Sequence, residues 1–233
     1  HHADLGIAYD GDGDRIGVID EQGGILWGDQ LMVVLSRALL REVPGAPIVA
    51  EVKCSQTLFD DIARHGGKPI MSQVGHSLIK ARMKQEHAEL AGEMSGHIFY
   101  KHRYFGFDDA IYTTARLVEI LSQTDRPVSA LLDGLPRTYA TPELRVDCPD
   151  EIKFDVVAGV LAAFRATHEV IDIDGARVRF PDGWGLVRAS NTGPVLVLRC
   201  EAESPESRDR IRDALTTAIE RVKGTLAGKQ VTA

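Results

Sequence analysis

The feature that most constrains the fold is a regular alternation of short apolar segments with helical segments in the first half of the chain. Strands are predicted at residues 48–52, 69–73 and 88–91, and helices between them, the first capped by Ser55 and the second at residues 77–86. Strands and helices that alternate at these lengths form a parallel sheet covered by helices. The sequence therefore predicts an α/β domain.

The segments on either side of this alternation extend the prediction. Two β-prone segments, residues 5–9 and 16–19, flank an acidic loop, and a helix follows from Asp29 until Pro44 stops it. After the alternation, a longer helix has an apolar face formed by Ile111, Ala115, Val118 and Leu121. Residues 127–136 then lead into a region with a different pattern.

From about Arg137 the pattern predicts an α+β domain. Extended segments are predicted at residues 137–146 and between 168 and 203, and a helix at residues 154–164. The last helix begins with Ser204 as its N-cap and Pro205 at its first position. Its buried stripe is predicted to be Ile211, Leu215, Ala218, Val222 and Leu226. The fold class is therefore α/β, with a parallel-sheet α/β domain followed by a smaller α+β C-terminal domain.

Composition and charge exclude several classes of function. The chain has 233 residues, of which 44% are hydrophobic and 26% charged. It has no apolar run of about 18 residues, so no membrane span and no membrane partner are expected. The net charge of −7 argues against a nucleic-acid partner, which normally needs a basic face. Three scattered cysteines, Cys54, Cys148 and Cys200, argue against a disulfide scaffold and a cysteine zinc site, and we expect a cytoplasmic protein.

The acidic loop (residues 10–15) has the strongest local signal. Asp10, Asp12 and Asp14 alternate with glycines, and their charges repel one another unless a cation lies between them. A site made only of oxygen ligands suits Mg²⁺ or Ca²⁺. An EF-hand loop needs glycine where Arg15 stands, and a dinucleotide-binding loop needs glycine where Ile16 stands. The EF-hand stays a minor alternative, since Glu21 does stand at its twelfth position, and a solvated acidic turn is the other alternative.

Two further polar loops follow predicted strands. The Glu93 loop (residues 92–97, Gly-Glu-Met-Ser-Gly-His) offers a carboxylate, a hydroxyl and an imidazole at a strand's carboxyl end, where ligands of such sheets bind. The Arg188 loop (residues 188–194, Arg-Ala-Ser-Asn-Thr-Gly-Pro) offers donors that match the oxygens of a phosphate. Each also fits an ordinary polar turn. Lys53 follows a buried strand, and His76 opens a helix whose free N–H groups favour an anion.

In their order and spacing these three loops resemble those of the α-D-phosphohexomutase family, specifically its bacterial phosphomannomutase/phosphoglucomutase branch. Met94 within the Glu93 loop, and Ser-Asn-Thr-Gly-Pro within the Arg188 loop, favour this branch over the glucosamine branch. The resemblance covers the whole chain. It implies a second-domain tail with the metal loop (residues 1–24), a third domain with the sugar-binding loop (25–136) and a C-terminal phosphate-binding domain (137–233).

One part of the family pattern is missing from these residues. The family's Ser-His-Asn motif, which carries a phosphorylated serine, does not occur in the sequence. The chain starts with His1 and His2 and lacks an initiator methionine, which is typical of a tag remnant joined to the middle of a larger protein, with a processed N-terminus as the alternative. We therefore expect a mutase fragment that binds substrate but does not turn over. The alternative is a stand-alone, non-catalytic phosphosugar- or metal-binding module.

The resemblance implies an isomerase that interconverts hexose 1-phosphates and 6-phosphates of mannose and glucose and supplies exopolysaccharide precursors. A phosphoserine and a bisphosphate intermediate, glucose 1,6-bisphosphate, carry the phosphoryl group. Mg²⁺ is expected on Asp10, Asp12 and Asp14, weakly or not at all without the phosphoserine, and the parent protein is expected to be monomeric. The implied catalytic residues are Arg15, Lys53 and His76. The implied substrate-binding residues are Lys53, His76, Glu93, Met94, Ser95, Gly96, His97, Arg188, Ala189, Ser190, Asn191 and Thr192.

Overall fold

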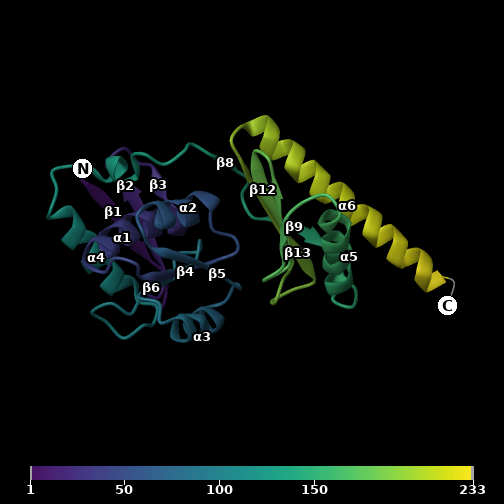
Figure 1. Cartoon of the computed structure of the whole chain (residues 1–233), viewed down its shortest axis with the longest axis horizontal. Coiled ribbons are helices and arrows are strands. Elements are labelled where there is room, and N and C mark those ends of the chain that lie inside the picture. Colours follow the sequence, from purple (N-terminus) through teal and green to yellow (C-terminus); the bar gives the residue numbers. More distant parts are fainter. Residues whose placement is uncertain (1, 232–233) are drawn as a thin grey trace. The chain divides into compact units, whose positions relative to one another are not determined.

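The computed structural model describes residues 2–231 and forms two compact units, residues 1–136 and residues 137–233 (Figure 1). Within the described residues, no helix is both long and apolar enough to cross a membrane. All three cysteines are free and buried, as expected from their scattered positions.

The first unit is built on two sheets. The strands β1 (Leu5–Tyr9), β2 (Ile16–Asp20) and β3 (Ile25–Leu26) form an antiparallel sheet in that order. The second sheet has the order β5 (Lys68–Ser72), β4 (Pro47–Glu51), β6 (Leu90–Gly92), β7 (Ile98–Tyr100). β4 is parallel to β5 and β6, which confirms the predicted parallel core, whereas β7 is antiparallel to β6. β7 was not predicted, because three fully buried residues give no alternation of apolar and polar positions.

Helices cover both faces of the second sheet. They are α1 (Gly28–Glu42), α2 (Gln56–Arg64), α3 (His76–Glu86) and α4 (Ala110–Leu121), followed by the short helix η1 (Val128–Leu132). Alternate residues of β4 point to opposite faces, as they must in a strand. Ile48 and Ala50 belong to the core formed with α1 and α2, whereas Val49 belongs to a separate cluster with Ile79 and Met83 of α3.

Most of the apolar face predicted for α4 is exposed, and only its last residue, Leu121, is partly buried against the core. Ile111 is 67% exposed and Val118 49% exposed, while Leu117 and Ile120 on another side of the helix are buried. The helix carries two apolar stripes, and helical periodicity alone does not say which one meets the core. Arg116 is also buried. Its guanidinium carbon lies 5.1 Å from the centre of the Tyr100 ring, a contact that helps to stabilise the buried charge.

The second unit is an antiparallel sheet with two helices, which agrees with the predicted α+β domain. Its strands are β8 (Tyr139–Ala140), β9 (Leu144–Asp147), β10 (Val170–Ile171), β11 (Ala176–Phe180), β12 (Gly183–Ala189) and β13 (Val195–Ala202). The order is β10-β11-β12-β13-β8, and β9 pairs with the first half of β13.

Its helices, α5 (Lys153–Arg165) and α6 (Pro205–Val231), pack side by side against the sheet (Figure 1). The Ser204 hydroxyl oxygen accepts a hydrogen bond from Ser207 N at 3.1 Å, which confirms the predicted cap. Of the predicted stripe on α6, Ile211, Leu215 and Ala218 are buried, and the other two residues are partly buried.

Gly28 provides a test of how closely α1 packs on the Glu93 loop. A Cβ at this position would lie 2.2 Å from the Glu93 carbonyl oxygen and 2.8 Å from that of Met94, and backbone atoms cannot swing aside. We expect Gly28→Ala to lower the free energy of unfolding of the first unit by about 1–3 kcal/mol, measured by urea denaturation. Gly17→Ala, at an exposed position of β2 in the same unit, is the control, because its Cβ would meet no atom closer than 4.0 Å. An unchanged urea midpoint for Gly28→Ala would contradict the close packing.

Candidate functional site

All three loops singled out in the sequence connect antiparallel strands. The acidic loop joins β1 to β2, the Glu93 loop joins β6 to β7, and the Arg188 loop joins β12 to β13. The first two belong to the first unit and the third to the second unit. Because a hairpin fixes both ends of its loop, each loop is held in place by strand pairing.

The acidic loop gathers its three carboxylates around one point. Asp10, Asp12 and Asp14 each place a carboxylate oxygen within 4.8 Å of the others. Arg15 Nε lies 2.5 Å from Asp10 Oδ2, and this hydrogen bond holds the pKa of Asp10 down at about 2. Burial raises the pKa of Asp14; the charge of His97 opposes this, while the charges of Asp12 and Asp10 add to it. Within residues 2–231, the buried Asp14 Oδ1 has no hydrogen-bond partner. Arg15 Nε lies 4.0 Å from this oxygen without a hydrogen bond to it, and a buried carboxylate oxygen that accepts no hydrogen bond, beside two further carboxylates, suits a cation.

The acidic loop and the Glu93 loop are joined through their backbones. Arg15 and His97 form an antiparallel β-bridge, and Ile16 N donates to the Gly96 carbonyl oxygen at 3.1 Å. Gly96 has a φ of +96°, and a Cβ there would lie 2.5 Å from the Ile16 carbonyl oxygen. Only glycine combines this backbone conformation with such a close approach.

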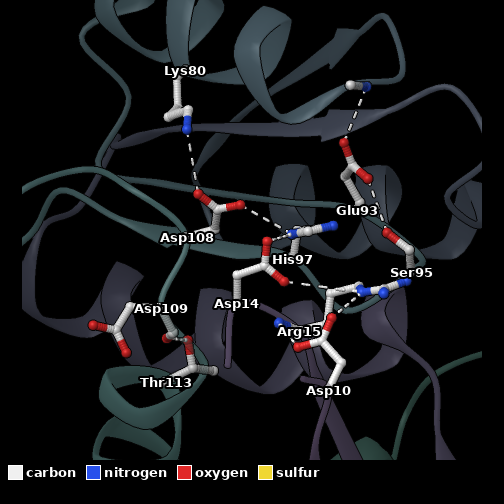
Figure 2. Close-up of polar contacts among 11 residues, drawn as sticks. Asp10, Asp14, Arg15, Lys80, Glu93, Ser95, His97, Asp108, Asp109 and Thr113 are labelled. Carbon is white, nitrogen blue, oxygen red and sulfur yellow. Dashed lines mark hydrogen bonds and ion pairs between the residues drawn. The ribbon is translucent and has the colours of Figure 1, made fainter. Parts of the chain in front are cut away.

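His97 is the centre of the polar network in Figure 2. Its Nδ1 lies 3.0 Å from Asp108 Oδ2 and 3.6 Å from Asp14 Oδ2. Lys80 Nζ lies 3.4 Å from the other oxygen of Asp108. This chain of contacts orients the imidazole between the acidic loop and α3.

Asp108 is a site residue that the sequence analysis missed. The available signal was a pair of adjacent carboxylates, Asp108 and Asp109, directly before α4. Asp109 caps the helix by accepting from Tyr112 N at 2.8 Å. Asp108, which does not act as the cap, reaches His97. The sequence alone does not show which of the two aspartates caps the helix and which contacts His97.

Glu93 is 5% exposed and connects its own loop to the start of α3. Its Oε1 accepts from Gly75 N at 3.1 Å, and its Oε2 accepts from the Ser95 hydroxyl at 2.9 Å (Figure 2). His76, which follows Gly75 and begins α3, is exposed. Its ring stacks on that of His97, with the two ring centres 6.3 Å apart. The Glu93 loop and the helix start, which were predicted separately, therefore lie together.

Glu51 lies buried beneath the Glu93 loop and was also missed by the sequence analysis. Its Oε1 accepts from Met94 N at 3.2 Å and its Oε2 accepts from Lys53 N at 2.5 Å, so one carboxyl links the predicted Lys53 to the loop. Burial raises the pKa of Glu51 to about 7, against the opposing charge of Lys53. The signal was a glutamate ending an otherwise apolar strand.

The Arg188 loop has an unused donor. Arg188 lies at the end of β12, is 5% exposed, and donates from Nε to Asp174 Oδ2 at 3.1 Å. Its Nη2 is buried and has no hydrogen-bond partner in the part of the chain that the structure describes. At the turn, the Ser190 hydroxyl oxygen accepts from Thr192 N at 3.2 Å. A buried guanidinium N–H without an acceptor suits an anionic ligand.

The raised pKa of Glu51 predicts a pH dependence of stability. Because the folded-state pKa of about 7 exceeds the ordinary glutamate value of 4.5, the folded state holds this proton more tightly than the unfolded state. The stabilisation is complete below about pH 4.5 and is lost as the pH rises through about 7. We expect the first unit to lose about 1–3 kcal/mol between pH 5 and 8 from this carboxyl, measured by urea denaturation.

Glu51→Gln tests the assignment, because it removes the titrating proton and keeps an acceptor oxygen. The variant is expected to show a clearly smaller loss of stability over the same pH range. Asp125→Asn, at an exposed position, is the control and is expected to follow the original chain. Equal pH dependence in Glu51→Gln and the original chain would contradict the prediction.

Comparison with known proteins identifies similar sequences and structures for both units. Residues 27–139 match the model for phosphoglucomutase/phosphomannomutase, alpha/beta/alpha domain III, and residues 143–218 match the model for the phosphoglucomutase/phosphomannomutase C-terminal domain. A phosphomannomutase/phosphoglucomutase of Pseudomonas putida is 48% identical over 225 residues, which are 96% of this chain and 49% of that protein.

Solved structures agree with the sequence matches. A phosphoglucomutase/phosphomannomutase family protein of Burkholderia thailandensis superimposes with a TM-score of 0.88 at 44% identity, over 96% of this chain and 48% of that one. An Aspergillus fumigatus N-acetylphosphoglucosamine mutase, solved with GlcNAc-6P and magnesium, shares the fold with a TM-score of 0.68 at 16% identity, over 93% of this chain and 48% of that one. The chain spans about half the length of the relatives it matches.

Proposed function

The chain belongs to the phosphoglucomutase/phosphomannomutase family, and we propose that it is the part of a hexose-phosphate mutase that holds the metal, the sugar and the non-reacting phosphate. The full-length enzyme interconverts the 1-phosphates and 6-phosphates of glucose and mannose. The observation that carries the proposal is the backbone junction of the acidic loop with the Glu93 loop. This junction brings metal-binding carboxylates beside groups that hydrogen-bond a polyol.

Residues 1–24 are proposed to end a preceding domain, and residues 25–136 and 137–233 to be the sugar-binding and phosphate-binding domains. The phosphoryl donor is proposed to be a phosphoserine of the full-length protein outside these 233 residues, since the Ser-His-Asn sequence does not occur in them. Glucose 1,6-bisphosphate is the proposed intermediate. We place the enzyme in the cytoplasm, because three free, buried cysteines suit a reducing compartment.

The acidic loop fits Mg²⁺. Its donor set is all oxygen, one oxygen of each carboxylate lies within 4.8 Å of the others, and the buried Asp14 Oδ1 has no hydrogen-bond partner among the described residues. Asp10, Asp12 and Asp14 are therefore the proposed ligands. When bound, the ion would supply positive charge that stabilises the transferring phosphoryl group.

The residues around this loop have distinct proposed roles. Arg15 is the last residue of the acidic loop, beside the Asp10 carboxylate, and is proposed to add positive charge where the phosphoryl group transfers. His97 is a further proposed proton acceptor for the attacking sugar hydroxyl: in the tautomer whose Nδ1–H donates to Asp108, Nε2 is the acceptor atom. Lys53 and His76 remain proposed contacts to the substrate and further candidates for proton transfer.

Sugar and phosphate recognition are assigned to the other two loops. Glu93 and Ser95 are proposed to bind the 3- and 4-hydroxyls of the sugar, with the rest of their loop lining the ligand. Glucose and mannose differ only at C2, so contacts at C3 and C4 do not separate them. Arg188, Ser190, Asn191 and Thr192 are proposed to bind the non-reacting phosphate, and the unpartnered Arg188 Nη2 supports this.

The first test is calorimetric titration of the chain with glucose 1-phosphate. Arg188→Ala and Glu93→Ala are each expected to lower the affinity at least about ten-fold, because each removes charge-assisted hydrogen bonds. Arg221→Ala and Asp125→Asn, at exposed positions, are the matched controls and should bind like the original chain. Absence of binding by the original chain, or retention of full affinity in both site variants, would contradict the proposed sites.

A second test concerns the metal. Because the phosphoserine oxygen is a proposed ligand outside this chain, we expect Mg²⁺ to bind only weakly, with a dissociation constant on the order of millimolar. Asp14→Asn is expected to weaken the binding further, whereas Asp125→Asn should leave it unchanged. Calorimetric titration with MgCl₂ measures both. Micromolar affinity in the unaltered chain would show that the three aspartates suffice by themselves.

A further inference from the structure

Lys153, at the start of α5, is buried and bonded to the Arg188 loop from within the second unit. It is 7% exposed, and its Nζ donates to the Ser190 carbonyl oxygen at 2.7 Å and to the Gly193 carbonyl oxygen at 3.3 Å. A third bond, at 2.7 Å, goes to Asp150 Oδ1. An ammonium has three N–H donors, so all three are used.

The position of Lys153 is unfavourable for a lysine on two counts. Removing an ammonium from water costs free energy unless it is paired. The first turn of a helix also disfavours a positive charge, because the helix dipole is positive there. The bonds to the loop and to Asp150 must offset both costs. The position of Lys153 therefore makes sense as support for the Arg188 loop, because the charge does not stabilise the helix in which it stands.

The two carbonyl groups bound by Lys153 lie on either side of the turn at Asn191 and Thr192. One ammonium therefore fixes both ends of the turn. The peptide bonds of the described chain are not cis, and in a planar trans peptide the C=O and N–H groups point in opposite directions. With the Ser190 carbonyl turned toward Lys153, the Asn191 N–H of the same peptide group points away from Lys153. Backbone N–H groups that point outward from a turn bind phosphate oxygens.

We propose that Lys153 is a positioning residue for phosphate binding: its ammonium holds the Arg188 loop in the conformation that presents the Asn191 N–H to the ligand. The inference rests on the proposed phosphate site and adds to it a residue that touches no ligand. It acts through backbone carbonyls, so it predicts an effect on loop order as well as on affinity. A purely electrostatic contribution would change affinity alone.

The experiment is an NMR titration of the chain with inorganic phosphate, which needs neither sugar nor metal, combined with amide hydrogen exchange. Lys153→Met keeps the length of the side chain and removes the charge and the donors. We expect at least a five-fold loss of phosphate affinity and faster exchange at Asn191 and Thr192. Amides of β11 should exchange as before, and urea denaturation should still show a folded second unit.

Lys223→Met is the matched control. Lys223 also bonds a backbone carbonyl, that of Asp147 at 2.9 Å, together with a carboxylate, but it does not bond the Arg188 loop. Its loss should leave phosphate affinity and the exchange at Asn191 unchanged. Lys153→Arg should give intermediate values, because a planar guanidinium keeps the charge without the tetrahedral arrangement of donors.

The outcomes distinguish a wrong role for Lys153 from a wrong phosphate site. Unchanged affinity in Lys153→Met, or reduced affinity with unchanged amide exchange, overturns the positioning role while the phosphate site stands. If the original chain shows no response to phosphate, the phosphate site itself is wrong, and the inference is wrong with it. If Lys153→Met does not fold, Lys153→Arg decides: a looser loop with weaker binding supports the proposal, and values equal to those of the original chain overturn it.

Discussion

The candidate site of the first unit depends on a short backbone junction between two hairpin loops. Ile16 donates to the Gly96 carbonyl, and Arg15 and His97 bridge beside it, so the three-stranded sheet and the end of β6 are fixed relative to each other. Gly96 allows the approach because it has no Cβ and a positive φ. The acidic loop and the Glu93 loop are thereby held together by backbone atoms, and their side chains remain available for ligands.

Around these loops the protein buries polar groups that a purely structural protein would avoid. Glu51 lies beneath the Glu93 loop, Asp108 behind His97, and Lys153 beneath the Arg188 loop, each bonded to the loop or side chain it supports. Buried polar groups cost free energy unless they are paired. Among the described residues, Asp14 Oδ1 and Arg188 Nη2 are two of the buried side-chain atoms that have no hydrogen-bond partner, and they are the atoms proposed to bind the metal and the phosphate.

The loops could be found from the sequence because their signals are local. Alternating aspartates indicate a cation site, and Arg-Ala-Ser-Asn-Thr-Gly indicates a phosphate site, from residues that all lie within seven positions of one another. The supporting residues could not be found in this way. Lys153 lies 37 residues before Ser190, and Glu51 lies 43 residues before Met94, so their roles exist only when distant segments meet. The exposed face of α4 has the same cause, since both of its stripes are apolar and only packing selects one.

The sequence by itself determined the α/β class, the strand and helix pattern around the parallel core, and the identity of the three polar loops. These depend on periodicity, capping and residue chemistry, which act over a few residues. The tertiary structure decided which loops lie together, which of two adjacent aspartates caps a helix and which reaches His97, and which buried charge is bonded to which loop. Those outcomes depend on hydrogen bonds between segments far apart in the chain, and such bonds leave no pattern in the local sequence.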